Sequence, residues 1–182
     1  MTRRATASTS LAIGALLLFA STTSTVGAQR VRYSVFAGVA VPADDYGARG
    51  IGPLVRASAT WGEVPRHVHL RADIEATILT SQSAAGAVRT VSAMLNYVVG
   101  GKSARFSPYG YVGGGAQVIS VSGASSATQW APDVRAGVGV RARLREREWS
   151  AEIARHVALT DYGTGTDFGS ASYVPIAIGV SY

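Results

Sequence analysis

The stretch Tyr173-Val174-Pro175-Ile176-Ala177-Ile178-Gly179-Val180-Ser181-Tyr182 decides how the rest of this 182-residue sequence is interpreted. Apolar or aromatic residues occupy every second position from Val174 to Tyr182, and the positions between them hold small residues. A period of two is typical of a β-strand, in which successive side chains point to opposite faces of the sheet. The stretch therefore predicts a strand with one apolar face and one face of small residues.

Seven further segments show the same alternation. In the clearest one, apolar residues at the even positions from Val68 to Ile78 alternate with polar and charged residues at the odd positions. The run Gly113-Gly114-Gly115 gives its segment no clear phase, so the faces taken by Tyr109 and Tyr111 stay unassigned. The predicted strands cover residues 31–41, 53–62, 67–78, 90–99, 108–121, 133–144, 149–160 and 173–182.

The amino-terminal residues have the pattern of a secretory signal peptide. Arg3-Arg4 precedes an apolar run from Leu11 to Ala20, and small residues lead to a cleavage position after Ala28. The apolar run is too short for a transmembrane helix, which needs ~20 residues. We therefore expect residues 1–28 to be removed and residues 29–182 to form one domain.

Composition excludes several functional classes. Hydrophobic residues make up 47% of the chain, which argues against disorder, and the absence of cysteine excludes a disulfide framework, a zinc–cysteine cluster and a cysteine nucleophile. The net charge of +6 comes from scattered arginines rather than a basic patch interleaved with aromatic residues, so nucleic-acid binding is not expected. No cofactor and no metal site are predicted.

An exported chain whose only long apolar pattern is that of strands can cross a membrane only as a closed barrel. Lipid offers no hydrogen-bond partner to a free backbone group, so every such group must be paired within the sheet. Eight strands are an even number, and the connections are long after the odd strands and short after the even ones. Up-and-down topology then gathers aromatic residues at both rims. One predicted girdle consists of Tyr33, Trp61, Tyr97, Tyr109, Trp149 and Tyr182, and the other of Tyr46, Trp130, Tyr162, Phe168 and Tyr173.

The sequence ends on an aromatic residue preceded by alternating apolar positions, and this segment is the last of eight predicted strands. In this pattern the sequence resembles the small OmpA/OmpX-type outer-membrane barrels. The resemblance covers nearly all of residues 29–182. It implies an all-β, single, closed, up-and-down antiparallel transmembrane barrel in the bacterial outer membrane. It also implies contact with outer-membrane lipid and lipopolysaccharide, and recognition of the closing strand by the barrel-assembly machinery. We expect a monomer.

The inward faces of the predicted strands carry both signs of charge. These lumen residues are Arg56, Arg71, Asp73, Glu75, Arg135, Arg141, Arg143, Glu152 and His156. They would form a selective pore, a proton-linked gate or an internal salt-bridge plug. We favour the plug, because an eight-stranded barrel is just wide enough for its own side chains and buried charges must pair. A four-residue turn at Arg145–Glu148 would set Arg141 directly across from Glu152.

Two other functions are considered. Ser150, Glu152 and His156 share one face of a strand, but a separation of six residues is ~20 Å, too far for a catalytic triad. The segment from Arg155 to Ala158 resembles the His-x-Ser stretch of barrel lipid A deacylases, with alanine in place of the nucleophile. A soluble, lipocalin-like carrier disagrees with the charged lumen.

Two features stay open in the sequence. The loop aspartates Asp44, Asp45, Asp161 and Asp167 are interpreted as solvated charges, with calcium or lipopolysaccharide binding as the alternative. Arg155 falls on the lipid-facing phase, where either snorkelling or a β-bulge would accommodate it.

Overall fold

The computed structural model describes residues 31–43, 50–62, 68–79, 87–100, 106–121, 127–159 and 172–182. Within these ranges, no helix is long and apolar enough to span a membrane. The predicted signal peptide lies outside the described residues. So do the loop aspartates Asp44, Asp45, Asp161 and Asp167 and the rim aromatics Tyr46, Tyr162 and Phe168.

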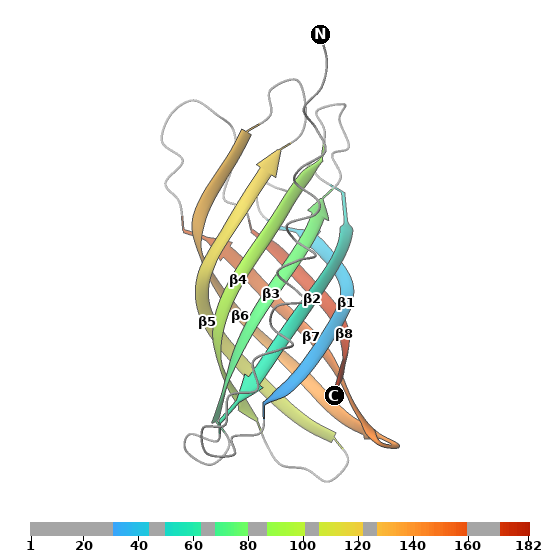
Figure 1. The fold of residues 1–182 in the computed structure, drawn as a ribbon. Helices are drawn as coiled ribbons and strands as arrows, with labels where there is room; N and C mark the ends of the chain where they lie inside the picture. The colour runs from blue at the N-terminus through green and yellow to red at the C-terminus, as the bar shows by residue number, and fades with distance from the viewer. Residues whose placement is uncertain are drawn as a thin grey trace.

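Eight antiparallel strands form one closed barrel in sequence order, as Figure 1 shows. They are β1 (Arg32–Pro42), β2 (Gly52–Trp61), β3 (Val68–Leu79), β4 (Val88–Gly100), β5 (Phe106–Val121), β6 (Ala127–Leu144), β7 (Arg147–Ala158) and β8 (Tyr173–Ser181). Each strand pairs with its neighbours in the chain. The predicted all-β, up-and-down barrel is therefore confirmed.

The barrel closes through β1 and β8, as the sequence predicts. Their register runs from Ser34 opposite Ser181 to Pro42 opposite Tyr173. Beyond β8, the backbone N–H of Tyr182 donates to the carbonyl of Tyr33 over 2.9 Å. This pairing leaves neither terminal strand with an open edge, which is the condition for a sheet in hydrocarbon.

Apolar side chains cover the outside of the barrel, and polar side chains face inward. Val112, Val138 and Ile178 keep 59%, 59% and 61% of their surface exposed. This arrangement is the reverse of a soluble core and suits a lipid surround. It also settles the facing of β5, because Tyr109 and Tyr111 are each 5% exposed and point into the lumen.

Most strand boundaries lie within two residues of the predicted ones, and the largest difference is at the start of β6. Strand β6 begins at Ala127, so Trp130 lies on a strand rather than in a long loop, and residues 122–126 alone connect β5 to β6. The pairing of β5 with β6 continues through Trp130 opposite Val118, and these cross-strand bonds outweigh the polar composition that suggests a loop. The β6–β7 turn holds only Arg145 and Glu146.

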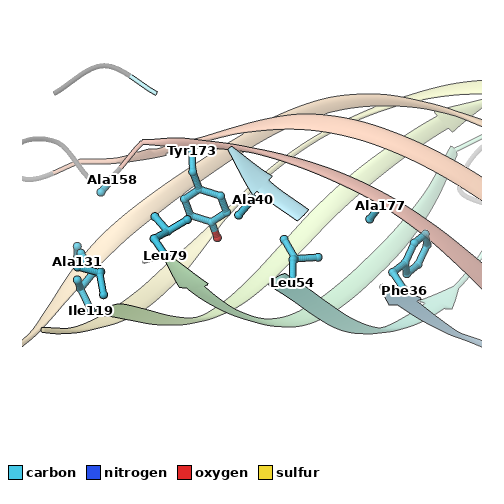
Figure 2. Packing of buried hydrophobic residues seen from close by; sticks show 10 residues of the cluster. Phe36, Ala40, Leu54, Leu79, Ile119, Ala131, Ala158, Tyr173 and Ala177 are labelled. Atoms are coloured by element: carbon cyan, nitrogen blue, oxygen red, sulfur yellow. The ribbon is translucent and has the colours of Figure 1, made fainter. Parts of the chain in front are cut away.

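The upper end of the barrel in Figure 1 carries the connections that follow β1, β3, β5 and β7. Inside this end, the lumen is filled by apolar side chains. Figure 2 shows Leu54, Leu79, Ile119 and Tyr173 pointing inward from four different strands. The two leucines, like Val88 of β4, are no more than 2% exposed. An apolar layer therefore closes the lumen above the charged residues.

Candidate functional site

Glu152 of β7 is the first centre of the charged lumen. Its carboxylate accepts hydrogen bonds from Arg56, from Arg71 Nη1 at 2.7 Å and from the hydroxyl groups of Tyr109 and Tyr111, the last at 3.0 Å. These donors come from β2 and β3 on the far side of the barrel and from β5, two strands away from β7. One carboxylate thus links side chains from several parts of the barrel wall.

Asp73 and Glu75 of β3 form the second centre. Arg135 reaches both, with a direct ion pair to Asp73 and Nη1 3.3 Å from Glu75 Oε2. Asn96 donates from Nδ2 to Asp73 at 3.1 Å, and its Oδ1 accepts from Arg135 Nε at 3.4 Å. The hydroxyl of Tyr173 donates to Glu75 over 2.8 Å. These contacts satisfy buried charge with charge and with hydrogen bonds, as burial requires.

His156 joins the second centre to Asp133. Its Nδ1 lies 2.7 Å from Asp133 Oδ2, and its Nε2 lies 3.4 Å from Glu75 Oε1. The imidazole stacks on the Tyr173 ring with centroids 4.5 Å apart and planes 8° from parallel. The contact with Asp133 is a hydrogen bond, so the imidazole links this fourth buried carboxylate to the second centre.

Three of the arginine guanidinium groups stack on the faces of aromatic rings. Arg56 lies 4.1 Å from the centroid of Phe36, and Arg71 lies 4.2 Å from that of Tyr111. Arg141 lies 4.2 Å from the Tyr109 centroid. Planar guanidinium groups stack well on aromatic faces, so the rings hold the arginines in the geometry that meets the carboxylates.

The structure places most of the predicted lumen residues together. Those no more than 5% exposed are Arg56, Arg71, Asp73, Glu75, Arg135, Glu152 and His156. Arg141 lies at the lower mouth with 18% of its side chain exposed, its Nε 3.9 Å from Glu148 Oε1. Arg143 is exposed at the rim. Seven of the nine predicted lumen residues are therefore buried in the charged network.

The predicted pairing of Arg141 with Glu152 is wrong. Because the β6–β7 turn has two residues rather than four, Leu144 pairs with Arg147, and Arg141 lies opposite Ser150. Glu152 lies opposite Gly139, which has no side chain, and turns to the far wall for its partners. The side chains of both residues are on the predicted face of the sheet, but the β6–β7 register differs from the predicted one by two residues.

Five participants are absent from the predicted set of lumen residues. They are Asn96, Tyr109, Tyr111, Asp133 and Tyr173, and all are 5% exposed or less. Asn96 and Asp133 occupy polar positions in the alternation of their strands, and this alternation is the sequence feature that indicates an inward-facing side chain. The rim assignment of Tyr109 and Tyr173 is wrong, because both rings fill the lumen and donate to carboxylates. Strand position alone cannot separate a rim tyrosine from a lumen tyrosine.

Other predicted rim aromatics do face outward. Tyr33, Tyr97, Trp149 and Tyr182 are 43%, 58%, 42% and 67% exposed, and Trp61 is half-buried. At the other end, Trp130 is 63% exposed. The contiguous β6–β7 register through Arg155 shows no bulge, and the Arg155 side chain is exposed on the outside.

The geometry offers little for hydrolysis. His156 is fully buried, and Ala158 follows it where a nucleophile would stand. Ser150 is six residues from His156 along β7, and its cross-strand partner is Arg141. Among the described residues, no group of three or more metal-ligating side chains gathers. The lumen is organised for ion pairing rather than for access by a substrate.

No family model and no curated protein sequence matches the chain. Solved structures do match. Neisserial surface protein A aligns with a TM-score of 0.65 and 15% identity over 83% of this chain and 95% of its own. The amino-terminal barrel of Pseudomonas aeruginosa OprF aligns at 0.51 with 13% identity, over 85% of this chain and 99% of that one.

Ail, the attachment invasion locus protein of Yersinia pestis, aligns with a TM-score of 0.52 and 11% identity over 84% of this chain and 97% of its own. Because these structures are only 11–15% identical to the chain in sequence, the matches are evidence for the fold alone. The chain has the fold of the small eight-stranded outer-membrane barrels, which is the family its sequence resembles. The predicted location agrees with that of these neighbours.

Proposed function

From this fold, we propose that the chain spans the bacterial outer membrane as a plugged, non-enzymatic barrel that presents its longer connections at the cell surface. The role is structural or interactive: envelope integrity, adhesion or ligand contact through those connections. The expected orientation follows the general rule that short turns face the periplasm. The barrel-assembly machinery would recognise β8, and outer-membrane lipid and lipopolysaccharide would surround the apolar exterior of a monomer.

The observation that carries this proposal is the contrast between the two faces of the sheet. The lumen holds a network that links Glu152 to Arg56 and Arg71, and Asp73 to Arg135, with an apolar layer above. The outer face exposes valine, isoleucine and leucine side chains along every strand. A continuous aqueous path would have to break several buried ion pairs, at about 3–5 kcal/mol for each charge left unpaired.

The two alternatives have weaker support. A lipid-modifying enzyme needs an accessible nucleophile beside its histidine, whereas His156 is enclosed by Asp133, Glu75 and Tyr173. A soluble carrier of hydrophobic ligands needs an apolar cavity, whereas the centre of this lumen is occupied by paired charges. The soluble carrier also does not account for the apolar exterior.

Membrane extraction tests the location. We expect the protein to fractionate with the outer membrane and, in detergent, to run at different positions on a gel before and after boiling. Recovery in the soluble periplasmic fraction would contradict the proposal. Planar-bilayer recording tests the plug: we expect no stepwise conductance, and regular steps would show that the lumen conducts. Release of fatty acid from purified lipid A would contradict the non-enzymatic role.

A further inference from the structure

The lower end of the outer face carries a row of side chains at one height. Leu144 pairs with Arg147 across the β6–β7 turn, and the Arg147 guanidinium lies 4.9 Å from the centroid of the Tyr182 ring. Tyr182 is bonded in turn to Tyr33 of β1. Leu144, Tyr182 and Tyr33 are 57%, 67% and 43% exposed. A cation therefore stands among apolar and aromatic groups, facing outward at the rim.

Such a row has the composition of a membrane–water interface. Tyrosine and tryptophan settle at headgroup level because one end of each ring is apolar and the other polar. Trp149, one step further along the outer face of β7, pairs with Val180. Arg147 is thus held at the depth where lipid phosphates lie. The aromatic contact fixes it there rather than leaving it to extend into bulk water.

A groove begins on the same outer face, on the membrane side of this row. Its volume is about 890 Å³, and the lining includes Val140, Ala151, Ile153 and Ile178. It also includes Gly110 of β5, where an added Cβ would meet nothing closer than a backbone oxygen at 3.7 Å. Small side chains between branched ones leave this hollow. From Arg147 to Ile153 the strand advances ~20 Å, comparable to an extended acyl chain.

We propose that an anionic glycerophospholipid of the periplasmic leaflet binds this surface, with its phosphate on Arg147 and an acyl chain in the groove. This inference rests on the proposed membrane insertion and adds a defined lipid site to it. The cation favours an anionic headgroup over a zwitterionic one by charge complementarity. A second copy of the chain is the less suitable occupant, because it would bring the same positive charge to the same place.

The test uses full-length protein extracted in detergent and titrated with phosphatidylglycerol or phosphatidylcholine of identical chains. Native mass spectrometry measures the lipid bound. We expect the wild type to retain phosphatidylglycerol more tightly, and Arg147→Gln to lower that affinity about fivefold, the effect of one interfacial arginine, while lowering the affinity for zwitterionic phosphatidylcholine less. Arg147→Lys should preserve the preference. The control Arg89→Gln removes an equal charge at the opposite rim and should leave the binding unchanged.

A second pair of variants tests the groove without changing charge. Gly110→Leu fills it and should weaken both lipids. Gly114→Leu places the same side chain on the outer face of the same strand, outside the groove and also without a close contact, and should weaken neither. Equal affinity of the wild type for both lipids, or equal effects of the two leucine variants, would overturn the inference. A self-associated species in place of bound lipid would identify the groove as a protein interface.

Failure of the proposed function gives a different result. Protein that does not insert into phosphatidylcholine vesicles contradicts the barrel's location. Protein that inserts but shows no headgroup preference contradicts the lipid site alone. If Arg147→Gln does not reach the folded, heat-modifiable form, the Gly110→Leu and Gly114→Leu pair decides the question.

Discussion

His156 is the residue that joins Asp133 to the rest of the lumen network. The network contains three guanidinium groups and four carboxylates, all 5% exposed or less. A buried polar group that loses its partner is costly. The short contact to Asp133 and the longer one to Glu75 place the imidazole between two of these carboxylates.

We expect His156→Gln and Asp133→Asn each to destabilise the barrel by about 1–3 kcal/mol, because each removes one partner of a buried hydrogen bond and leaves the other partner unsatisfied. The double variant removes both partners and should cost clearly less than the sum. Urea unfolding in detergent, followed by gel mobility, measures the free energy of unfolding of each of the three variants. Strictly additive losses would mean that the two side chains are not coupled.

For individual residues, the sequence predicts which side chains face the lumen better than it predicts which of those side chains pair. Alternation assigns Arg56, Arg71 and Glu152 to the inward face, because strand geometry determines facing. It cannot show that Arg56 reaches Glu152, since the two are 96 residues apart and meet across the barrel rather than across a strand pair. Such contacts depend on shear and side-chain length, which no local pattern contains.

At the scale of the strands, β6 makes room for the tyrosines of β5. Gly137 lies opposite Tyr111, and Gly139 lies opposite Tyr109, both on the lumen face. A Cβ at position 137 would stand 2.6 Å from Tyr111 Cζ and 2.7 Å from Ala154 Cβ. The glycines therefore let both rings lie flat across β6 and direct their hydroxyl groups to Glu152.

Gly137→Val should destabilise the barrel by about 3 kcal/mol or more, since overpacking displaces Tyr111 and its hydrogen bond to Glu152. Gly114→Val is the matched control, because its side chain points outward into open space and should change the stability little. Urea unfolding in detergent compares the two. Equal losses would show that any branched residue on these strands is disruptive, whatever its facing.

The β6–β7 turn has a backbone conformation that its sequence does not favour. Arg145 has φ of 59°, in the left-handed region where a side chain costs ~1–2 kcal/mol. Replacing Arg145 by glycine should stabilise the protein by about 1 kcal/mol, and Glu146→Gly, at a position without positive φ, should destabilise it. Unfolding in zwitterionic detergent tests both. If Glu146→Gly stabilised the protein instead, the backbone strain would lie at Glu146 rather than at Arg145.

This turn also explains why the predicted register is wrong. A charged run such as Arg145–Glu148 has no glycine or asparagine to indicate a two-residue turn, so a longer one is the natural expectation. Shortening the turn by two residues preserves facing and shifts every pair. The error therefore leaves the fold unchanged and displaces the cross-strand partners along β6 and β7, those of Arg141 and Glu152 among them.

At the scale of the whole molecule, the alternation of eight segments is enough to predict the closed barrel. An apolar outer face on every strand excludes a soluble sandwich, and lipid requires that β1 meet β8. Orientation does not follow from closure, because a barrel is equally closed either way up. It depends on the connections, which are longest at the upper end, where residues 159–172 join β7 to β8.

The last prediction therefore concerns orientation. The sequence places protease-sensitive positions near Ala48, Ser126 and Gly165, which lie outside the described residues. Protease added to intact cells should cut near Ala48 and Gly165, since those connections are long enough to enter an active site. Cleavage near Ser126 should be slower, because residues 122–126 are a short link between paired strands. The turn at Arg145 and Glu146 should be cut only after the cells are opened, although it contains one arginine–glutamate bond and a second, Arg147–Glu148, follows it in β7. Cutting there in intact cells, with the connection at residues 159–172 protected, would mean that the barrel is inserted with its short turns outward.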